Sequence, residues 1–276
     1  MLLDIDRLER ENILVEVGDD GVQGYIIAAG EVIPFDRIRG IYARPLDLPK
    51  QSGQDPIAQL RAQSFQSMFL EWLEFAPPLV VSRPHVMESN FSKPLQSQFI
   101  ARSGFGVPET IVTNNPQAVK EFWRRHQRVI FKSISGIRSI VQELNQENAA
   151  RLDRVQWLPT QFQAYVPGVD VRVHVVGAQT FATEVSSGAI DYRYAGRVGM
   201  DADLTAIQLS EQIESQCINL ATSLDLPFCG IDLRRCPNGE YVCFEVNPMP
   251  AYTYYQAHTN QAISMALVKL LAGIKK

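Results

Sequence analysis

The sequence predicts a mixed α/β or α+β fold for a chain of 276 residues. Strand-like and helix-like patterns alternate along it, and no internal repeat or low-complexity tract is present. With 46% hydrophobic residues, the chain can bury a substantial core as one large domain or two modest ones. We expect a small N-terminal α/β lobe over residues 1–90 and a larger domain over residues 91–276.

The N-terminal lobe reads as short strands separated by Gly and Asp turns, followed by a helix. Apolar residues recur at near-helical spacing over residues 57–75, and Pro77 and Pro78 end that helix. The predicted strands are residues 13–17, 25–28, 31–33, 40–43 and 79–82.

The larger domain begins with helices and continues with strands. Pro94 suits the first turn of a helix that stops at Gly104, and a second helix is predicted over residues 116–125. One apolar face predicts a helix over residues 210–224, and Pro237-Asn238-Gly239 predicts the turn of a hairpin. The predicted strands are residues 108–113, 128–133, 137–141, 160–166, 170–176, 179–185, 228–234 and 240–246, and a helix over residues 263–271 ends the chain.

Composition excludes several classes of protein. A net charge of −4 without any Lys/Arg run argues against a nucleic-acid partner. The charged start and the lack of a long apolar stretch predict a cytoplasmic protein without a signal peptide or membrane span. The four cysteines show no CxxC pairing, so we expect reduced thiols in the core or in the hairpin.

The most informative segment is the last hairpin, because Asp232 and Glu245 stand inside apolar strands. Buried carboxylates need a cation. Asn247 follows Glu245 by two residues, so the two side chains share a face of the strand. Two carboxylates and an amide suit Mg²⁺, which implies a nucleotide triphosphate as partner. Alternatively, Asp232 pairs with Arg234 or Arg172 and Glu245 caps a turn.

Two further segments agree with a nucleotide site. Lys132 ends an apolar strand, where its ammonium can meet a phosphate beside a Ser/Gly turn, although a solvent-reaching strand end is the alternative. No Walker motif is present. The segment from Gln163 to Arg172 joins two strands, so its backbone could bind adenine. Asp170 could accept a hydrogen bond from a ribose hydroxyl, and Arg172 could face a phosphate or a carboxylate.

In this order of motifs, residues 83–271 resemble the ATP-grasp superfamily, and within it the RimK-like ligases and the peptide-tailoring ligases related to the microviridin enzymes. The resemblance implies an ATP-grasp fold with two α+β subdomains, at about residues 91–165 and 166–276. It implies that Asp232, Glu245 and Asn247 bind one or two Mg²⁺ ions, with Mn²⁺ as a substitute. It also implies catalytic roles for Lys132, Arg172 and Arg193. The nucleotide-binding residues that it implies are Lys93, Lys132, Ser133, Ser135, Gly136, Gln163, Ala164, Val166 and Asp170.

The chain departs from the family pattern at three places. Ala164 stands where an acidic residue is common, the loop after Ser133 has a single glycine, and the lobe before residue 90 is short. Because that lobe normally helps to bind the acceptor, the acceptor is left undefined. Ligases of this family often form dimers or tetramers, so self-association is a further expectation.

Several residues near these motifs are candidates for binding substrate. Residues 83–90 read as a polar loop that could line the acceptor site, or as a surface loop without a role. The tyrosines that follow Asn247 could wall a pocket or pack under the last helix. The loop of residues 194–204 could form a lid or be merely exposed, and His174 reads as a structural residue. The candidates in these segments are Arg83, His85, Asn90, Tyr252 and Tyr254.

The resemblance implies that a carboxylate attacks the γ-phosphate of ATP to form an acyl phosphate, which an amine then attacks to form an amide. Amino acids, peptides and small carboxylates or amines are all permitted substrates. One alternative is a kinase that stops at the phosphorylated product. The other is a non-catalytic nucleotide-binding regulatory protein.

Overall fold

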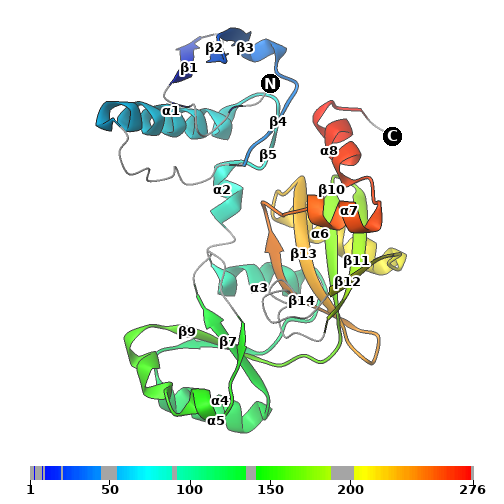
Figure 1. The fold of residues 1–276 in the computed structure, drawn as a ribbon. Helices are drawn as coiled ribbons and strands as arrows, with labels where there is room; N and C mark the ends of the chain where they lie inside the picture. Colours follow the sequence, from blue (N-terminus) through cyan, green and yellow to red (C-terminus); the bar gives the residue numbers. More distant parts are fainter. Residues whose placement is uncertain are drawn as a thin grey trace. The chain divides into compact units, whose positions relative to one another are not determined.

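The computed structural model describes residues 3, 8, 10–19, 21–44, 55–88, 92–134, 141–187 and 202–274 (Figure 1). The chain forms two compact units, residues 1–87 with 267–276 and residues 88–266. The division into domains and subdomains at residues 90 and 165 remains a prediction. The mixed α and β composition is confirmed. None of the described helices is both long and apolar enough to cross a membrane.

The first unit packs one long helix against short strands. A three-stranded antiparallel sheet has the order β1-β2-β3, and β4 pairs with β5 in parallel. Proline at the first turn and the Asp55 side chain, which accepts from the Ile57 N–H, begin helix α1. Its core face carries Phe65, Trp72 and Leu73, which pack with Phe35. The elements are β1 (Asn12–Gly18), β2 (Gly21–Ala28), β3 (Glu31–Pro34), η2 (Phe35–Arg37), β4 (Gly40–Tyr42), α1 (Pro56–Phe75), β5 (Leu79–Val81) and α2 (Pro84–Met87).

The second unit contains a four-stranded sheet of order β6-β9-β7-β8, whose neighbours are all antiparallel. Val119 and Phe122 of α4 pack with Val129 and Phe162 of this sheet, and Figure 1 shows α4 and α5 beside β7 and β9. The elements are α3 (Lys93–Arg102), β6 (Thr110–Thr113), α4 (Pro116–His126), β7 (Val129–Ser133), β8 (Gln142–Glu143), α5 (Gln146–Ala149), η4 (Leu152–Trp157) and β9 (Thr160–Ala164).

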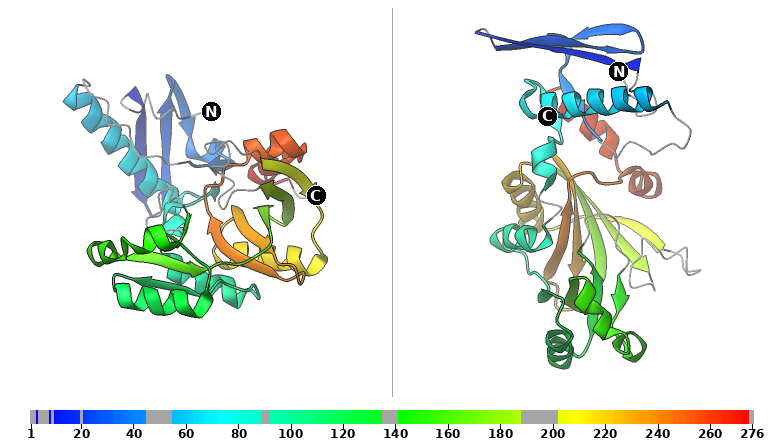
Figure 2. Two further views of the ribbon diagram at one scale, coloured as in Figure 1. Left: turned by 60° about the horizontal axis from the view of Figure 1, so that its bottom comes forward. Right: turned by 90° about the vertical axis from the view of Figure 1, so that its left-hand side faces the viewer.

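The same unit contains a five-stranded antiparallel sheet of order β12-β11-β10-β13-β14, whose strands lie side by side in both views of Figure 2. Its central strands β10 and β13 have neighbours on both sides, and most of their residues are buried. The elements are β10 (Val169–Val176), β11 (Gln179–Ser187), β12 (Ala202–Ile207), α6 (Glu211–Ser223), β13 (Phe228–Arg235), β14 (Tyr241–Asn247) and α7 (Thr253–Thr259). The last helix is α8 (Ile263–Leu271), whose residues from Leu267 on belong to the first unit.

Most predicted elements are confirmed within a few residues, and two expectations change. Residues 84–87 form helix α2 rather than a polar loop, since Pro84 opens a turn that buries Val86. The end of the expected loop at residues 194–204 belongs to strand β12, because residues 202–207 pair with β11; residues 188–201 lie outside the described part. The predicted strand at residues 137–141 lies almost wholly outside it as well.

The cysteines are free thiols, as expected. Cys217, Cys229 and Cys243 are buried, and Cys236 stands at the end of β13. Burial raises the pKa of the Cys229 thiol to about 12 and raises that of Cys243 well above its ordinary value. These thiols therefore behave as packing groups at neutral pH.

Candidate active site

The hairpin of β13 and β14 brings together the three predicted metal ligands. Asp232 is paired with Glu245 across the two strands, and Gly230 is paired with Asn247. The Asn247 side-chain amide donates to Asp232 Oδ2 at 3.2 Å and to Glu245 Oε1 at 3.3 Å. The two carboxylates and the amide therefore converge on one face of the sheet, as the spacing of Glu245 and Asn247 predicted.

Three cations from three other elements surround these carboxylates. Arg172 of β10 pairs through Nη1 with Asp232 Oδ1 at 2.5 Å, which realises one of the two ion pairs considered from the sequence. Lys93, at the start of α3, places Nζ 3.0 Å from Glu245 Oε2, and Lys132 of β7 places its Nζ 3.9 Å from the same oxygen. These side chains are 6–21% exposed, so their charges interact in a poorly hydrated environment. We call these three cations with Asp232, Glu245 and Asn247 the charge cluster.

The charge cluster fits a metal-bound polyphosphate in its chemistry. Two carboxylates and an amide offer the oxygen ligands that Mg²⁺ prefers. Within the described ranges, no group of three or more His, Cys, Asp or Glu side chains is placed to hold a metal, so a cation here depends on the amide as third ligand. Three positive side chains exceed two carboxylates by one charge, which favours an additional anion.

Gly230 leaves room for the guanidinium of Arg172. A methyl group at Gly230 would collide with Arg172 Nη2 and Cζ, since the two residues lie on the same face of neighbouring strands. The Tyr255 ring lies 5.7 Å from the guanidinium carbon on another side. Strand register, glycine and tyrosine together position Arg172 against Asp232.

His174 is a structural residue, in agreement with its position on an alternating strand. It is fully buried, and its Nε2 lies 3.2 Å from the Ala251 carbonyl oxygen. Burial, reinforced by the positive charge of Arg172, lowers the pKa of His174 to about 3. The imidazole is therefore neutral at physiological pH.

Gln96 contributes to the site but was missed in the sequence. It lies one helical turn after Lys93 on α3 and is 1% exposed. Its amide donates to the Val246 carbonyl at 2.8 Å and accepts from the Val246 N–H at 3.0 Å. Because β14 is the edge strand of its sheet, these backbone groups face away from β13. Gln96 thus fixes the strand that carries Glu245 and Asn247. It was not predicted because a buried glutamine opposite an edge strand has no distinctive pattern in the sequence.

The segment expected to bind adenine makes several hydrogen bonds to neighbouring elements. The Gln163 side chain donates to Thr110 Oγ1 at 3.0 Å, and the Ala164 N–H donates to the Glu109 carbonyl at 2.9 Å. Arg234 donates to the Val166 carbonyl at 2.8 Å and to Asp170 Oδ1 at 2.6 and 2.9 Å. Asp170 and the connection between β9 and β10 are therefore held by one guanidinium. Their roles in nucleotide binding stay predictions.

The remaining predicted residues lie outside the charge cluster or outside the described part of the chain. Ser133 ends β7 and is exposed, while Ser135, Gly136, Asn90 and Arg193 lie outside the described residues. Tyr252 packs edge-on against Phe228 at 5.6 Å, and Tyr254 is 48% exposed. A substrate role for either tyrosine stays a prediction.

Arg83 and His85 belong to the first unit. Arg83 donates to the carbonyl oxygens of Leu73, Glu74 and Ala76 and so caps the end of α1. His85, on α2 rather than in a loop, contacts Glu74 through both its backbone N–H and its ring. Both residues therefore make contacts that stabilise this unit, and a substrate role for either stays a prediction.

Comparison with known proteins identifies the family of this chain. A family model described as the RimK-like ATP-grasp domain matches residues 91–271. A probable alpha-L-glutamate ligase of Saccharophagus degradans is 23% identical over 189 residues, which cover 65% of this chain and 62% of that relative. The chain thus spans about three fifths of that relative's length.

Solved structures show the same fold. A RiPP-associated ATP-grasp ligase of Chryseobacterium gregarium, in complex with ADP and a leader and core peptide, gives a TM-score of 0.84 at 20% identity and covers 99% of this chain and 88% of its own. The ATP-grasp ligase PsnB, complexed with a phosphomimetic variant of minimal precursor, Mg and ADP, gives a TM-score of 0.78 at 24% identity, with 99% and 89% coverage. The predicted ATP-grasp fold is confirmed. Because the family model covers well over half of the sequence, the chain belongs to the RimK-like ATP-grasp family.

Proposed function

We propose that this chain is an ATP- and Mg²⁺-dependent ligase that joins a carboxylate to an amine through an acyl phosphate, with an amino acid or a peptide as acceptor. The charge cluster is the observation that carries this proposal. Its two carboxylates, one amide and three cations match a metal-bound triphosphate in charge and in ligand chemistry.

The residues of the charge cluster have different roles in this proposal. Asp232, Glu245 and Asn247 would hold Mg²⁺, which would supply positive charge for phosphate oxygens. Lys93 and Lys132, which reach the site from α3 and β7, would donate hydrogen bonds to those oxygens. Arg172 binds a substrate carboxylate or the transferred phosphoryl group with its planar fork. No side chain acts as nucleophile, so catalysis consists of positioning and charge stabilisation.

The relatives support an amide-forming reaction and a peptide or amino acid as substrate. The named relative is a probable glutamate ligase, and the solved ligases bind precursor or leader and core peptides, together with ADP and in one case Mg. Arg193 contributes to phosphate or substrate binding in this proposal, as the family pattern implies.

The test is ADP release with Mg·ATP against a panel of carboxylates and peptides, each with and without amines. ADP release that requires both a carboxylate and an amine, with an amide as product, supports the ligase. ADP release with one substrate and a stable phosphorylated product instead identifies a kinase. Nucleotide binding without turnover across the panel identifies a regulatory protein.

A matched pair of variants ties the activity to the charge cluster. Glu245→Gln removes one metal ligand and the partner of two lysines, so we expect ADP release to fall at least about 100-fold. Glu184→Gln changes a glutamate of the same sheet whose partner is Arg235, outside the cluster. Equal activity of the two variants would contradict the assignment of Glu245.

A further inference from the structure

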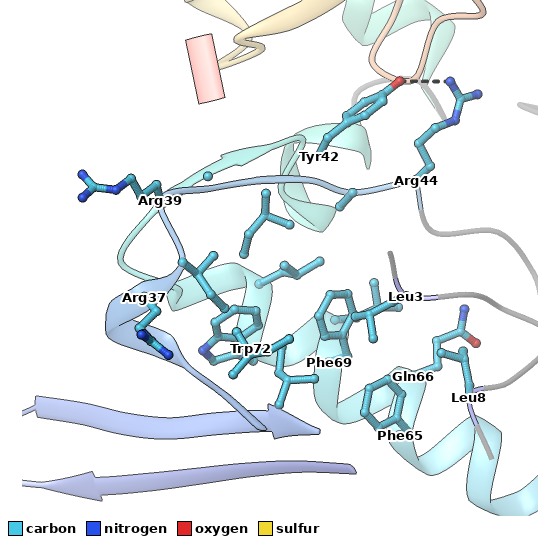
Figure 3. A pocket seen from close by; sticks show the side chains of 18 residues that line it. Leu3, Leu8, Arg37, Arg39, Tyr42, Arg44, Phe65, Gln66, Phe69 and Trp72 are labelled. Atoms are coloured by element: carbon cyan, nitrogen blue, oxygen red, sulfur yellow. Dashed lines mark hydrogen bonds between the residues drawn. The ribbon is translucent and has the colours of Figure 1, made fainter. Parts of the chain in front are cut away.

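Tyr165 stands in the connection between the two sheets of the second unit. It directly follows β9 of the four-stranded sheet, and the chain enters β10 of the five-stranded sheet at Val169. The aromatic residues Phe65, Phe69 and Trp72 line apolar space in the core of the first unit, so packing accounts for them (Figure 3). The ring of Tyr165 instead contacts two guanidinium groups.

The two guanidinium groups belong to different sheets, and a carboxylate fixes each of them. Arg128, immediately before β7, places its guanidinium carbon 3.5 Å from the centre of the Tyr165 ring, and it donates to Glu143 of β8 at 2.9 and 3.0 Å. Arg234 of β13 places its guanidinium carbon 5.8 Å from the same centre, and it donates to Asp170 at 2.6 and 2.9 Å. Both distances lie within the roughly 6 Å over which an aromatic ring attracts a cation. One ring thus links a fixed cation of each sheet.

Backbone contacts hold the connection around this ring as well. The Tyr165 N–H donates to the Arg128 carbonyl oxygen at 3.0 Å. Arg234 donates to the carbonyl oxygen of the next residue, Val166, at 2.8 Å. Gly168 packs so closely on β13 that an added methyl group would collide with the backbone of that strand. The connection is therefore fixed at each end, to the start of β7 through Tyr165 and to β13 through Val166 and Gly168.

The same two sheets meet again at the charge cluster. Lys132 of β7 lies 3.9 Å from Glu245 of β14. Arg128 precedes Lys132 by four residues, which is about 13 Å along an extended strand. Arg234 stands on β13, which pairs with β14. A change in the spacing of the sheets at Tyr165 therefore changes the distance between Lys132 and the carboxylates of the hairpin.

We propose that Tyr165 is a positioning residue, whose ring sets the spacing of the two sheets and so aligns Lys132 with the carboxylates of the β13–β14 hairpin. This rests on the proposed ligase function, since the alignment matters only if the charge cluster acts on ATP. A misplacement of about 1 Å can cost about 100-fold in rate. Tyr165→Leu keeps an apolar side chain but has no ring face for the cations, so kcat for ADP release should fall at least about tenfold. KM for ATP should stay within about twofold, because every side chain of the charge cluster is retained.

Further variants separate the ring from other effects at this position. Tyr165→Phe keeps the ring face and should retain most of kcat, whereas Arg128→Gln removes the nearer cation and should lower kcat as Tyr165→Leu does. Arg128 is the better partner to change, because Arg234 makes further contacts to the connection. Tyr241→Leu is the matched control, since Tyr241 opens β14 and its ring makes no aromatic or cation–π contact among the described residues. An unchanged kcat in Tyr165→Leu, an equal loss in Tyr165→Phe, or a rise in KM alone overturns the proposal.

A distance measurement without nucleotide tests the spacing apart from the activity. Spin labels at Lys120→Cys on α4 and Thr205→Cys on β12 report on the two sheets in a chain with Cys236→Ser, because both positions are exposed and the other three cysteines are buried. Pulsed electron spin resonance should give a broader distance distribution for Tyr165→Leu than for the parent chain and for Tyr165→Phe. An equally narrow distribution in all three overturns the proposal. Broadening in a chain that releases no ADP with any substrate supports the spacing role of Tyr165 and contradicts the ligase function.

Discussion

At the scale of single residues, Gly230 controls the position of Arg172. An added methyl group would meet the end of the Arg172 side chain rather than backbone, so the guanidinium can move away without a large rearrangement. We therefore expect Gly230→Ala to cost no more than about 1–3 kcal/mol of stability. It should nevertheless lower ADP release at least about tenfold, because Arg172 leaves Asp232. Urea denaturation and turnover measured on the same preparation test both parts.

Gly18→Ala is the control for this substitution. Gly18 ends β1, and a methyl group there would meet no atom within 4 Å. Turnover and stability should both stay close to those of the parent chain. A Gly230→Ala protein as active as the Gly18→Ala protein would show that the position of Arg172 does not limit the reaction.

His174 couples the stability of the chain to pH. In the unfolded chain its pKa is the ordinary 6.5, whereas burial lowers it to about 3 in the folded chain. Between these values the unfolded state binds the extra proton, so the free energy of unfolding falls as the pH falls below 6.5. This contribution amounts to about 1.4 kcal/mol per pH unit.

His174→Gln removes the titrating group and keeps a donor that can reach the Ala251 carbonyl. Urea denaturation at about pH 7.5 and about pH 5.5 should show a smaller loss of stability for the variant, by about 1 kcal/mol. An unchanged difference between the two pH values would mean that other groups account for the acid sensitivity.

At the scale of elements, the sequence was most informative where periodicity and turn chemistry agreed. The hairpin at Pro237-Asn238-Gly239 and the helix with Cys217 and Leu220 on its buried face were both predicted. The short helices α2, α5 and α7 were missed, because four to seven residues are too few to show an apolar period. Residues 202–204 of strand β12 were read as the end of a loop, because only the pairing with β11 identifies this segment as a strand.

The residues of the candidate site were likewise predicted only where the sequence carries a local signal. The three proposed metal ligands could be predicted because carboxylates are rare in apolar strands, and Lys132 because it ends one. Their partners could not be assigned, since the contacts of Lys93 and Arg172 depend on how α3 and β10 pack beside the hairpin. Gln96 and Gly230 act through geometry alone and have no chemical signature in the sequence.

The connection between β9 and β10 gives a prediction at the element scale. Arg234 holds the Val166 carbonyl and Asp170, and its guanidinium carbon also lies 5.2 Å from the Phe244 ring centre. Lysine keeps the charge but loses the planar fork. If this connection binds adenine, Arg234→Lys should raise KM for ATP about tenfold and change kcat much less.

Arg235→Lys is the matched control for that variant. Arg235 is the next residue of β13, and it pairs with Glu184 at 2.5 Å while remaining 39% exposed. An exposed ion pair contributes only about 0–1 kcal/mol, so neither KM nor stability should change appreciably. A rise in KM that is equal in both variants would show that the connection is not specific to ATP binding.

At the scale of the whole molecule, the charge cluster belongs to one of the two units. All six of its residues lie within residues 88–266. Each unit has a hydrophobic core of its own, one around Phe65 and Trp72 and one around Phe122 and Phe162. A ligand of one unit should therefore stabilise that unit first, which makes hydrogen exchange a direct way to locate binding.

Mg·ATP should protect the second unit in a manner that depends on the metal. A ligand at about 100 times its Kd stabilises the state that binds it by about 2.7 kcal/mol. We expect slower amide exchange in β10, β13 and β14 with Mg·ATP, and unchanged exchange in β1 and β2. Chelation of Mg²⁺ by EDTA, or Glu245→Gln in the presence of Mg·ATP, should abolish the difference, because EDTA removes the metal and Glu245→Gln removes the negative charge of one of its proposed ligands. Protection by Mg·ATP that persists in EDTA and in Glu245→Gln would place the nucleotide outside the charge cluster, and both the metal ligands and the mechanism built on them would then be wrong.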